Sequence, residues 1–214
     1  MRIFLLLLIL VTMASSPVYA HNLWLERDGN GPIRVYFGHY DTGMLEQTGE
    51  RLDIIKAETL FPADILVSQE RRADHIELAV SKSGDVALEE AMKPRKTRIG
   101  QEIVRMVFMA RCGRSETVAL LSLDLVPQAP ESNSFTLLLE GKPLPMTEIT
   151  VYDPARQGRS YRTDAAGRVA IESTASGRYL LLASSILDRS GEVDAIAYDK
   201  IRYGFSLTYT VENK

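Results

Sequence analysis

Short apolar stretches separated by turn residues are the feature that most constrains the fold of this chain. In residues 205–211, Phe, Leu, Tyr and Val occupy the odd positions and Ser or Thr the even ones, which is typical of a half-buried strand. Residues 33–37 alternate in the same way before Gly38, and residues 103–110 and 118–126 are strongly apolar. Such stretches, spaced by roughly 8–12 residues, predict an all-β protein of the sandwich kind.

Helical signals are scarce by comparison. Residues 87–92, with the sequence ALEEAM, favour a short helix that Pro94 limits. The composition then changes at residues 127–134 (PQAPESNS), which indicates a linker or an extended crossing between two domains. We therefore predict a mainly all-β chain with two β-sandwich domains in tandem, of the immunoglobulin or transthyretin-like kind, over residues 21–126 and 133–214.

Residues 1–20 have the pattern of a secretory signal peptide. Arg2 supplies a positive charge, residues 3–11 form an apolar stretch too short to span a membrane, and Val18 and Ala20 are small residues of the kind that signal peptidase requires. Cleavage after Ala20 predicts a periplasmic protein. No later segment approaches about 20 consecutive apolar residues, so the mature chain is not expected to span the membrane.

Charge and cysteine content narrow the classes of function. The chain has 25 Lys and Arg residues against 28 Asp and Glu residues, and no basic patch stands out, so we expect no nucleic-acid partner. Cys112 is the only cysteine, which excludes an internal disulfide and favours a buried thiol. The sequence shows no nucleophilic triad and no phosphate-binding glycine loop. We assign no catalytic residue and expect a binding protein rather than an enzyme.

The three histidines carry the clearest chemical signal. Cleavage after Ala20 makes His21 the first residue, so one residue offers an α-amine and an imidazole to a metal. His39, just after a predicted strand, adds a third nitrogen and completes a histidine brace. Such nitrogen donors suit copper(II) and nickel(II). The alternative is that His21 follows the cleavage site by accident and that His39 is a turn residue.

Three further residues are candidates for a supporting role. Asp41 is placed to orient a ligating imidazole, and Met44 to serve as a soft ligand for copper(I). A turn or packing role is the alternative for both. His75 begins a predicted strand among charged residues, which favours a surface imidazole, with a role as an additional ligand as the other reading.

Two resemblances follow from ordered motifs. Residues 133–185 resemble the carboxypeptidase-regulatory or transthyretin-like sandwich through a Gly-Lys-Pro-Leu turn at 141–144, a Thr-Asp-x-x-Gly turn at 163–167 and a Gly-x-Tyr step at 177–179. This likeness concerns the fold and not the function.

The whole mature chain resembles a family of exported bacterial proteins described as periplasmic components of nickel/cobalt uptake. The shared motifs, in order, are AHNLWL at residues 20–25, Gly38 followed by His39, DLVPQAP from Asp124, and the Gly-Lys-Pro-Leu turn. The resemblance implies His21 and His39 as metal ligands. It also implies that any transport role needs a membrane permease or another envelope protein as partner.

Three hypotheses of function follow. The first is a periplasmic protein that binds nickel, cobalt or copper for uptake or delivery, with the metal held by His21 and His39. The second is a histidine-brace copper oxidase acting on polysaccharide, against which the single Trp and the 7% content of aromatic residues argue. The third is a non-catalytic module that docks to an envelope partner, with incidental histidines.

Overall fold

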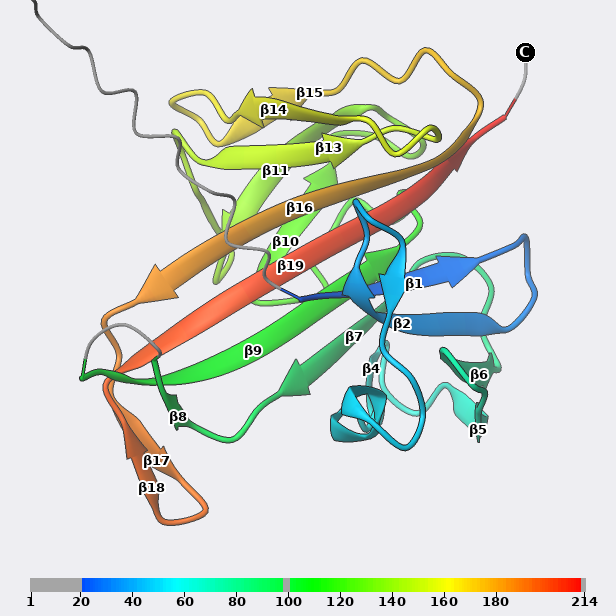
Figure 1. The fold of residues 1–214 in the computed structure, drawn as a ribbon. Coiled ribbons are helices and arrows are strands. Elements are labelled where there is room, and N and C mark those ends of the chain that lie inside the picture. The colour runs from blue at the N-terminus through cyan, green and yellow to red at the C-terminus, as the bar shows by residue number, and fades with distance from the viewer. Residues whose placement is uncertain (1–20, 98–100, 213–214) are drawn as a thin grey trace, which may run out of the picture.

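The regular structure of this protein is almost entirely β-strand. The computed structural model describes residues 21–97 and 101–212, so the predicted signal peptide lies outside the described residues. Within those ranges the only helix is a single 3-10 turn, η1 Arg51–Ile54. The described residues contain no helix long and apolar enough to cross a membrane. The predicted all-β class is confirmed (Figure 1).

The described strands form three larger sheets and one hairpin. The five-stranded sheet consists of β1 Asn22–Arg27, β2 Ile33–His39, β3 Met44–Leu45, β5 Leu66–Arg71 and β6 Ile76–Val80. The eight-stranded sheet consists of β4 Thr59–Phe61, β7 Val86–Ala91, β8 Arg95–Lys96, β9 Ile103–Cys112, β13 Glu148–Tyr152, β14 Gly158–Arg162, β16 Gly177–Leu187 and β19 Lys200–Val211. The four-stranded sheet consists of β10 Leu123–Pro127, β11 Ser134–Leu139, β12 Lys142–Pro143 and β15 Arg168–Ala170. The hairpin consists of β17 Gly191–Val193 and β18 Ile196–Tyr198.

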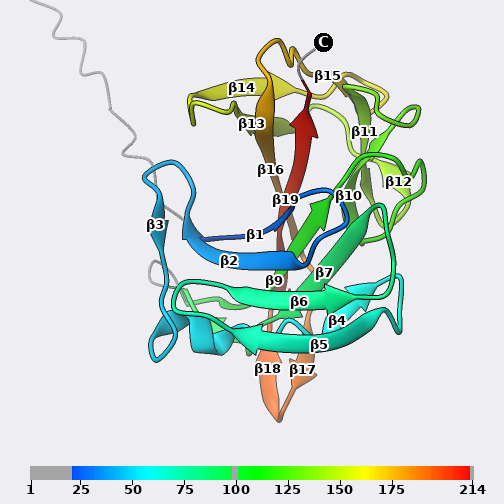
Figure 2. The ribbon, with the colours of Figure 1, turned by 90° about the vertical axis from the view of Figure 1, so that its right-hand side faces the viewer.

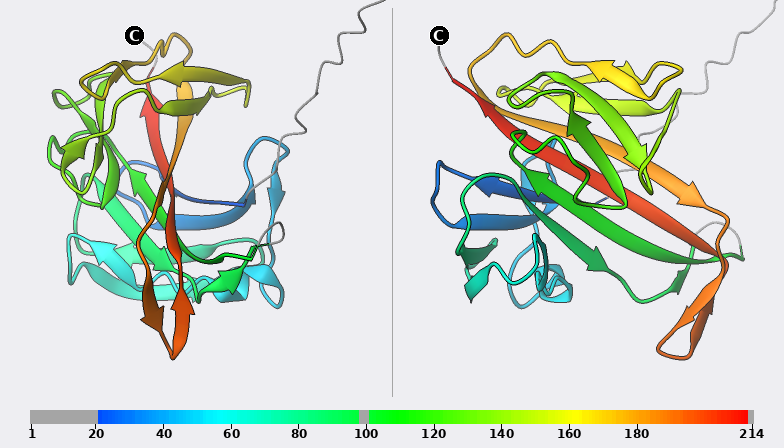
Figure 3. Two further views of the ribbon diagram at one scale, coloured as in Figure 1. Left: turned by 90° about the vertical axis from the view of Figure 1, so that its left-hand side faces the viewer. Right: turned by 180° about the vertical axis from the view of Figure 1, so that it is seen from behind.

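The eight-stranded sheet is the middle layer of the fold. Successive side chains of a strand point to opposite faces of its sheet. On β9, Val107 and Met109 accordingly enter one hydrophobic core, whereas Phe108 and Ala110 enter the other. Strands β1 and β2 cross one face of this sheet (Figure 1), and the four-stranded sheet covers the other face, seen from behind in Figure 3. Two sandwich cores therefore share one sheet.

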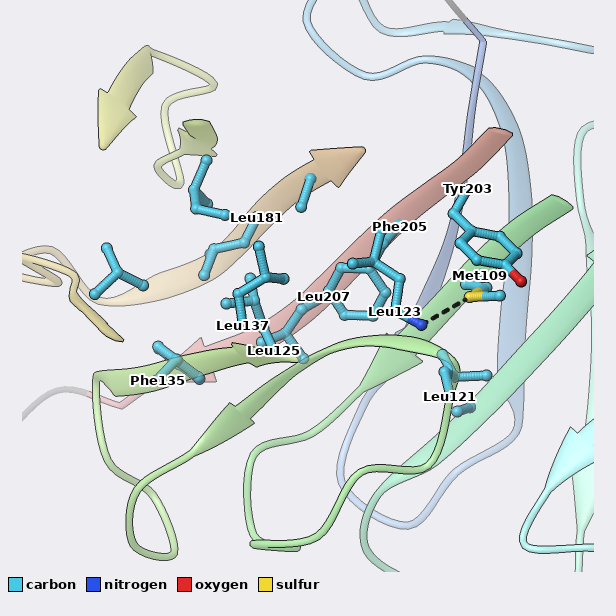
Figure 4. Packing of buried hydrophobic residues seen from close by; sticks show 14 of the residues in the cluster. Met109, Leu121, Leu123, Leu125, Phe135, Leu137, Leu181, Tyr203, Phe205 and Leu207 are labelled. Atoms are coloured by element: carbon cyan, nitrogen blue, oxygen red, sulfur yellow. Dashed lines mark hydrogen bonds between the residues drawn. The ribbon is translucent and has the colours of Figure 1, made fainter. Parts of the chain in front are cut away.

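The core against the four-stranded sheet is built mainly from leucine and aromatic side chains. Figure 4 shows Leu125 and Leu137 of the outer sheet facing Phe205 and Leu207 of β19. All four are buried, with exposed fractions of 2% or less. The odd positions of β19 thus bury their apolar side chains here, as the alternation in the sequence predicted.

Two of the three predicted polar positions of β19, Ser206 and Thr208, are buried as well, whereas Thr210 is exposed, so the prediction of a half-buried strand is wrong for the part of β19 that β1 crosses. The Ser206 hydroxyl donates a hydrogen bond to the Leu23 carbonyl at 2.7 Å, and the Thr208 hydroxyl donates one to the Leu25 carbonyl at 2.5 Å. Strand β1 lies across this face of β19. A short hydroxyl side chain can be buried here because the backbone of β1 accepts its hydrogen bond.

The helix predicted over residues 87–92 is also wrong, because residues 86–91 form strand β7. This strand pairs with β4 on one side and with β9 on the other. Ala87 faces one core while Val86 and Leu88 face the other. Pairing and burial on two faces override the helical propensity of a short Ala, Leu and Glu sequence.

The predicted boundary near residues 127–134 is crossed by strand pairing. Residues 128–133 connect β10 to β11, and these two strands pair with each other from Leu123–Leu139 to Pro127–Phe135. Strand β9 runs parallel to β19 and pairs with it from Val104 to Cys112. Hydrogen bonds thus join the two halves of the chain in two sheets. The division into two domains stays a prediction.

A buried ion-pair network connects β9 to the segments beside it. Arg111 donates to Asp85 at 2.6 Å and to Asp124 at 3.0 Å, and the three side chains are fully buried. The backbone carbonyls of Glu116 and Val118 accept further bonds from the same guanidinium at 2.6 and 3.5 Å. Burial raises the pKa of the Asp124 carboxyl, and the Arg111 charge only partly opposes this effect.

Replacing Asp85 by Ala is predicted to destabilise the protein strongly. The substitution leaves the Arg111 guanidinium buried without its shortest ion pair, which costs about 3–5 kcal/mol in comparable sites. Urea unfolding followed by circular dichroism measures the loss. Glu140→Ala is the control, because it removes an exposed pair with Arg189 and is expected to change stability little. Equal, small losses in the two variants would contradict the prediction.

Cys112 is a buried thiol, as the sequence analysis expected. It lies at the end of β9 opposite Val86 of β7, with 4% of its surface exposed. Burial raises the pKa of the thiol to about 11. The reactive thiolate is therefore disfavoured by burial and is shielded from reagents.

Cys112 is accordingly predicted not to react with a disulfide-exchange reagent at pH 8 while the protein is folded. One equivalent of thiol should be titrated once denaturant is added. Absorbance of the released chromophore measures both states in the same sample. Rapid labelling of the folded protein would show that the thiol is accessible.

Candidate functional site

The two predicted ligands His21 and His39 lie side by side at the end of the β1–β2 ladder. The antiparallel register pairs Asn22 with Gly38, so one further step places His21 opposite His39. Their ring centroids lie 4.5 Å apart, with the ring planes inclined by 50°. Residues 18 positions apart in the sequence thus become direct neighbours because a hairpin joins the two strands.

The two rings lie at the edge of the hydrophobic core between the five-stranded and eight-stranded sheets. His39 is 8% exposed, and 20% of the His21 side chain is exposed. The Phe37 ring, which belongs to this core, is 5.0 Å from the His21 ring and 5.4 Å from the Phe108 ring of β9. Packing on Phe37 holds the imidazole of His21 on one side and leaves it accessible on the other.

A carboxylate that the sequence analysis did not single out contacts His21. Glu46 Oε1 is hydrogen-bonded to His21 Nε2, and the Glu46 side chain is only 12% exposed. The Glu46 amide donates to the Phe37 carbonyl at 2.8 Å, which fixes the backbone of this residue against β2. The available signal was strand alternation: Glu46 is two residues beyond Met44 and therefore shares its face.

Arg51 of η1 adds a positive charge next to this pair. Its Nη1 atom lies 4.0 Å from Glu46 Oε1 and 3.3 Å from His21 Nε2. The Arg51 side chain is 59% exposed, so its attraction to the carboxylate is screened by solvent. The His21 ring is therefore oriented chiefly by Glu46, with Arg51 as a nearby counter-charge.

Met44 lies in the same row of residues. Strand β3 pairs with the end of β2 so that Met44 is directly opposite His39, and Figure 2 shows β3 at one edge of the molecule. The Met44 side chain is not needed for the core, since the residue is 51% exposed. His21 directly before β1, His39 at the end of β2 and Met44 of β3 thus form a row on one face of the sheet.

The other two candidates are placed differently. Asp41 is half-buried in the turn that connects β2 to β3. His75 Nδ1 is 2.8 Å from Asp74 Oδ1, and its ring lies 5.3 Å from that of Tyr36. Tyr36 alternates with Phe37 along β2 and so points to the opposite face. The structure therefore separates His75 from the other histidines.

The turn that follows His39 is attached to the C-terminal half of the chain. Arg156 donates to the Tyr40 carbonyl at 3.4 Å, and its guanidinium lies 5.1 Å from the centre of the Tyr40 ring. The Tyr40 ring in turn packs edge-on against Trp24 of β1 and against Tyr152 of β13. These contacts hold the backbone directly after His39.

The binding of a metal by His21 and His39 stays a prediction. Within the described ranges, no group of three or more His, Cys, Asp and Glu side chains is arranged to hold a metal ion. A metal held by His21 and His39 would therefore take its further donors from groups of other types. The α-amine that cleavage after Ala20 would create and the thioether of Met44 are donors of such types.

No protein family, curated protein or solved structure matches this chain. The resemblance to the nickel/cobalt-uptake family stays a prediction.

Gly38 allows β3 to approach β2 closely, and the geometry of the site depends on it. Its φ angle is +154°, and a Cβ atom at this position would lie 2.1 Å from the Met44 carbonyl oxygen. Any side chain here would push β3 away from β2. Met44 and Glu46 would then move away from the two histidines.

Gly38→Ala is predicted to break the pairing of β3 with β2 and to cost about 1–3 kcal/mol, the usual range for overpacking. Hydrogen exchange should show loss of protection at the Glu46 amide. Gly49→Ala serves as the control, because Gly49 also has a positive φ, +87°, but has no atom within 4 Å of the added Cβ. Unchanged protection at Glu46 in Gly38→Ala would refute the proposed constraint.

Proposed function

We propose that this chain is a periplasmic protein which, after cleavage behind Ala20, binds a divalent transition metal for uptake or delivery. The α-amine and Nδ1 of His21 and one ring nitrogen of His39 are the proposed ligands. The observation that carries the proposal is the pairing of His21 Nε2 with Glu46 next to the ring of His39.

The Glu46 contact favours Nδ1 of His21 as the metal ligand. An ionised carboxylate only accepts hydrogen bonds, so in the tautomer that donates from Nε2 to Glu46 the lone pair lies on Nδ1. Nδ1 is the ring nitrogen nearer the backbone, and it forms a chelate together with the α-amine of the same residue. Metal-bound histidines commonly donate their second ring nitrogen to a carboxylate in this way.

The donors favour one class of metal. Three nitrogen atoms suit copper(II), nickel(II) and cobalt(II) better than calcium or magnesium, which prefer oxygen ligands. Glu46 has its contact with His21, and Arg51 lies beside it, so the site offers no cluster of free carboxylates to a hard cation. Delivery of the metal requires a membrane permease or another envelope protein as a separate partner.

The proposal predicts stoichiometric binding that depends on a free His21 amine. Protein that has been exported and cleaved should bind one copper(II) or nickel(II) in an isothermal titration, with a nitrogen-rich axial EPR spectrum for copper. His21→Ala and His39→Ala should each lower the affinity by at least about tenfold, as should one extra residue before His21. His75→Ala is the matched control and should leave the affinity unchanged.

Binding should weaken as the pH falls from 8 to 6, because the metal must displace a proton from an amine whose ordinary pKa is about 8. Equal weak binding by the cleaved protein, the extended protein and the histidine variants would overturn the proposal. The envelope-docking hypothesis would then be preferred.

A further inference from the structure

Met44 has features that a packing role does not explain. Its side chain is 51% exposed although the residue is apolar and lies in a strand. The neighbouring Leu45, by contrast, packs on the cluster of Trp24, Tyr40 and Leu180. Strand β3 thus directs the Leu45 side chain inward and leaves the Met44 side chain opposite His39.

The backbone geometry of β2 and β3 fixes the position of Met44 relative to His39. Gly38 has no side chain to keep the Met44 carbonyl at a distance, and the register pairs Met44 with His39. Directly opposed residues of antiparallel strands have Cβ atoms about 4.5–5.5 Å apart. The flexible methionine side chain can span this distance to the imidazole face.

Glu46 shows that this segment reaches the site. Met44 and Glu46 lie on the same face of the extended segment, and the Glu46 carboxylate contacts His21 on the far side of His39. The segment after Gly38 therefore brings Met44 opposite His39 and Glu46 into contact with His21. Met44 is directly opposite His39 and half exposed, so its thioether would be available to an ion held by the two imidazoles.

We infer that the metal of this site is copper and that the site holds it in both oxidation states, with Met44 as the additional ligand of copper(I). The three nitrogen atoms of His21 and His39 serve copper(II), which prefers tetragonal nitrogen coordination. The soft Met44 sulfur together with imidazole serves copper(I). Nickel(II) and cobalt(II) have no corresponding use for a thioether. This inference rests on the proposed function.

The test compares the two copper states in cleaved protein. Competition against a chromophoric copper(I) chelator under reducing, oxygen-free conditions measures copper(I) affinity, and titration with EPR measures copper(II) binding. Met44→Leu should weaken copper(I) binding by at least about tenfold while leaving the copper(II) spectrum and affinity unchanged. Met146→Leu is the matched control, because Met146 is 61% exposed and lies in the C-terminal half.

The outcomes separate this inference from the proposed function. Unchanged copper(I) affinity in Met44→Leu would overturn the role of Met44, and intact copper(II) binding in the same sample would leave the proposed function standing. Loss of both copper states in Met44→Leu, with a normal unfolding curve, would contradict a role restricted to copper(I). Absence of binding in the unsubstituted protein would refute both proposals.

Discussion

The hydrogen bonds that fasten β1 across β19 are the interaction on which the rest of the structure depends. Two hydroxyl groups, those of Ser206 and Thr208, donate hydrogen bonds to the backbone carbonyls of Leu23 and Leu25 in β1. They attach the first described strand to the last one, although 183 positions separate the paired residues in the sequence. The position of His21 at the start of β1 is thus set by the C-terminal strand.

Further contacts between the two halves of the chain reinforce this attachment. Arg178 of β16 pairs with Glu26 and with Asp28, at 2.6 Å in both cases, which fastens the end of β1. Arg156 holds the turn after His39 through Tyr40. Each of these pairs is partly exposed, so the individual energies are small. Their common effect is to reduce the freedom of the hairpin that carries both histidines.

The chemistry of the site follows from its position at the edge of a core. The Phe37 ring packs against the His21 imidazole, and the Glu46 carboxylate is hydrogen-bonded to Nε2 of the same ring. Solvent reaches the other side, where Met44 lies. For the metal site that we propose, packing and hydrogen bonding would already have oriented the His21 ring before the metal arrives.

The sequence by itself determined the class of the fold and the position of its main elements. Alternating apolar residues revealed the strands, since a strand must turn every second side chain to its core. The residue types also identified the single buried thiol and the pair His21 and His39. The chemical identity of these residues can be recognised without coordinates, and the rings of the two histidines do lie 4.5 Å apart.

Only the tertiary structure decided what these elements contact. The sequence of β7 favours a helix, yet two neighbouring strands make it a strand. Ser206 and Thr208 of β19 are buried because β1 crosses the strand at these positions. Glu46 and Arg51 could not be found from the sequence because their contacts with His21 depend on the tertiary structure. A single Glu or Arg in a sequence does not indicate which imidazole it will contact. The alternation of apolar and polar residues is a local property, so it can be read from the sequence. Pairing between strands that are distant in the sequence depends on how the whole chain packs.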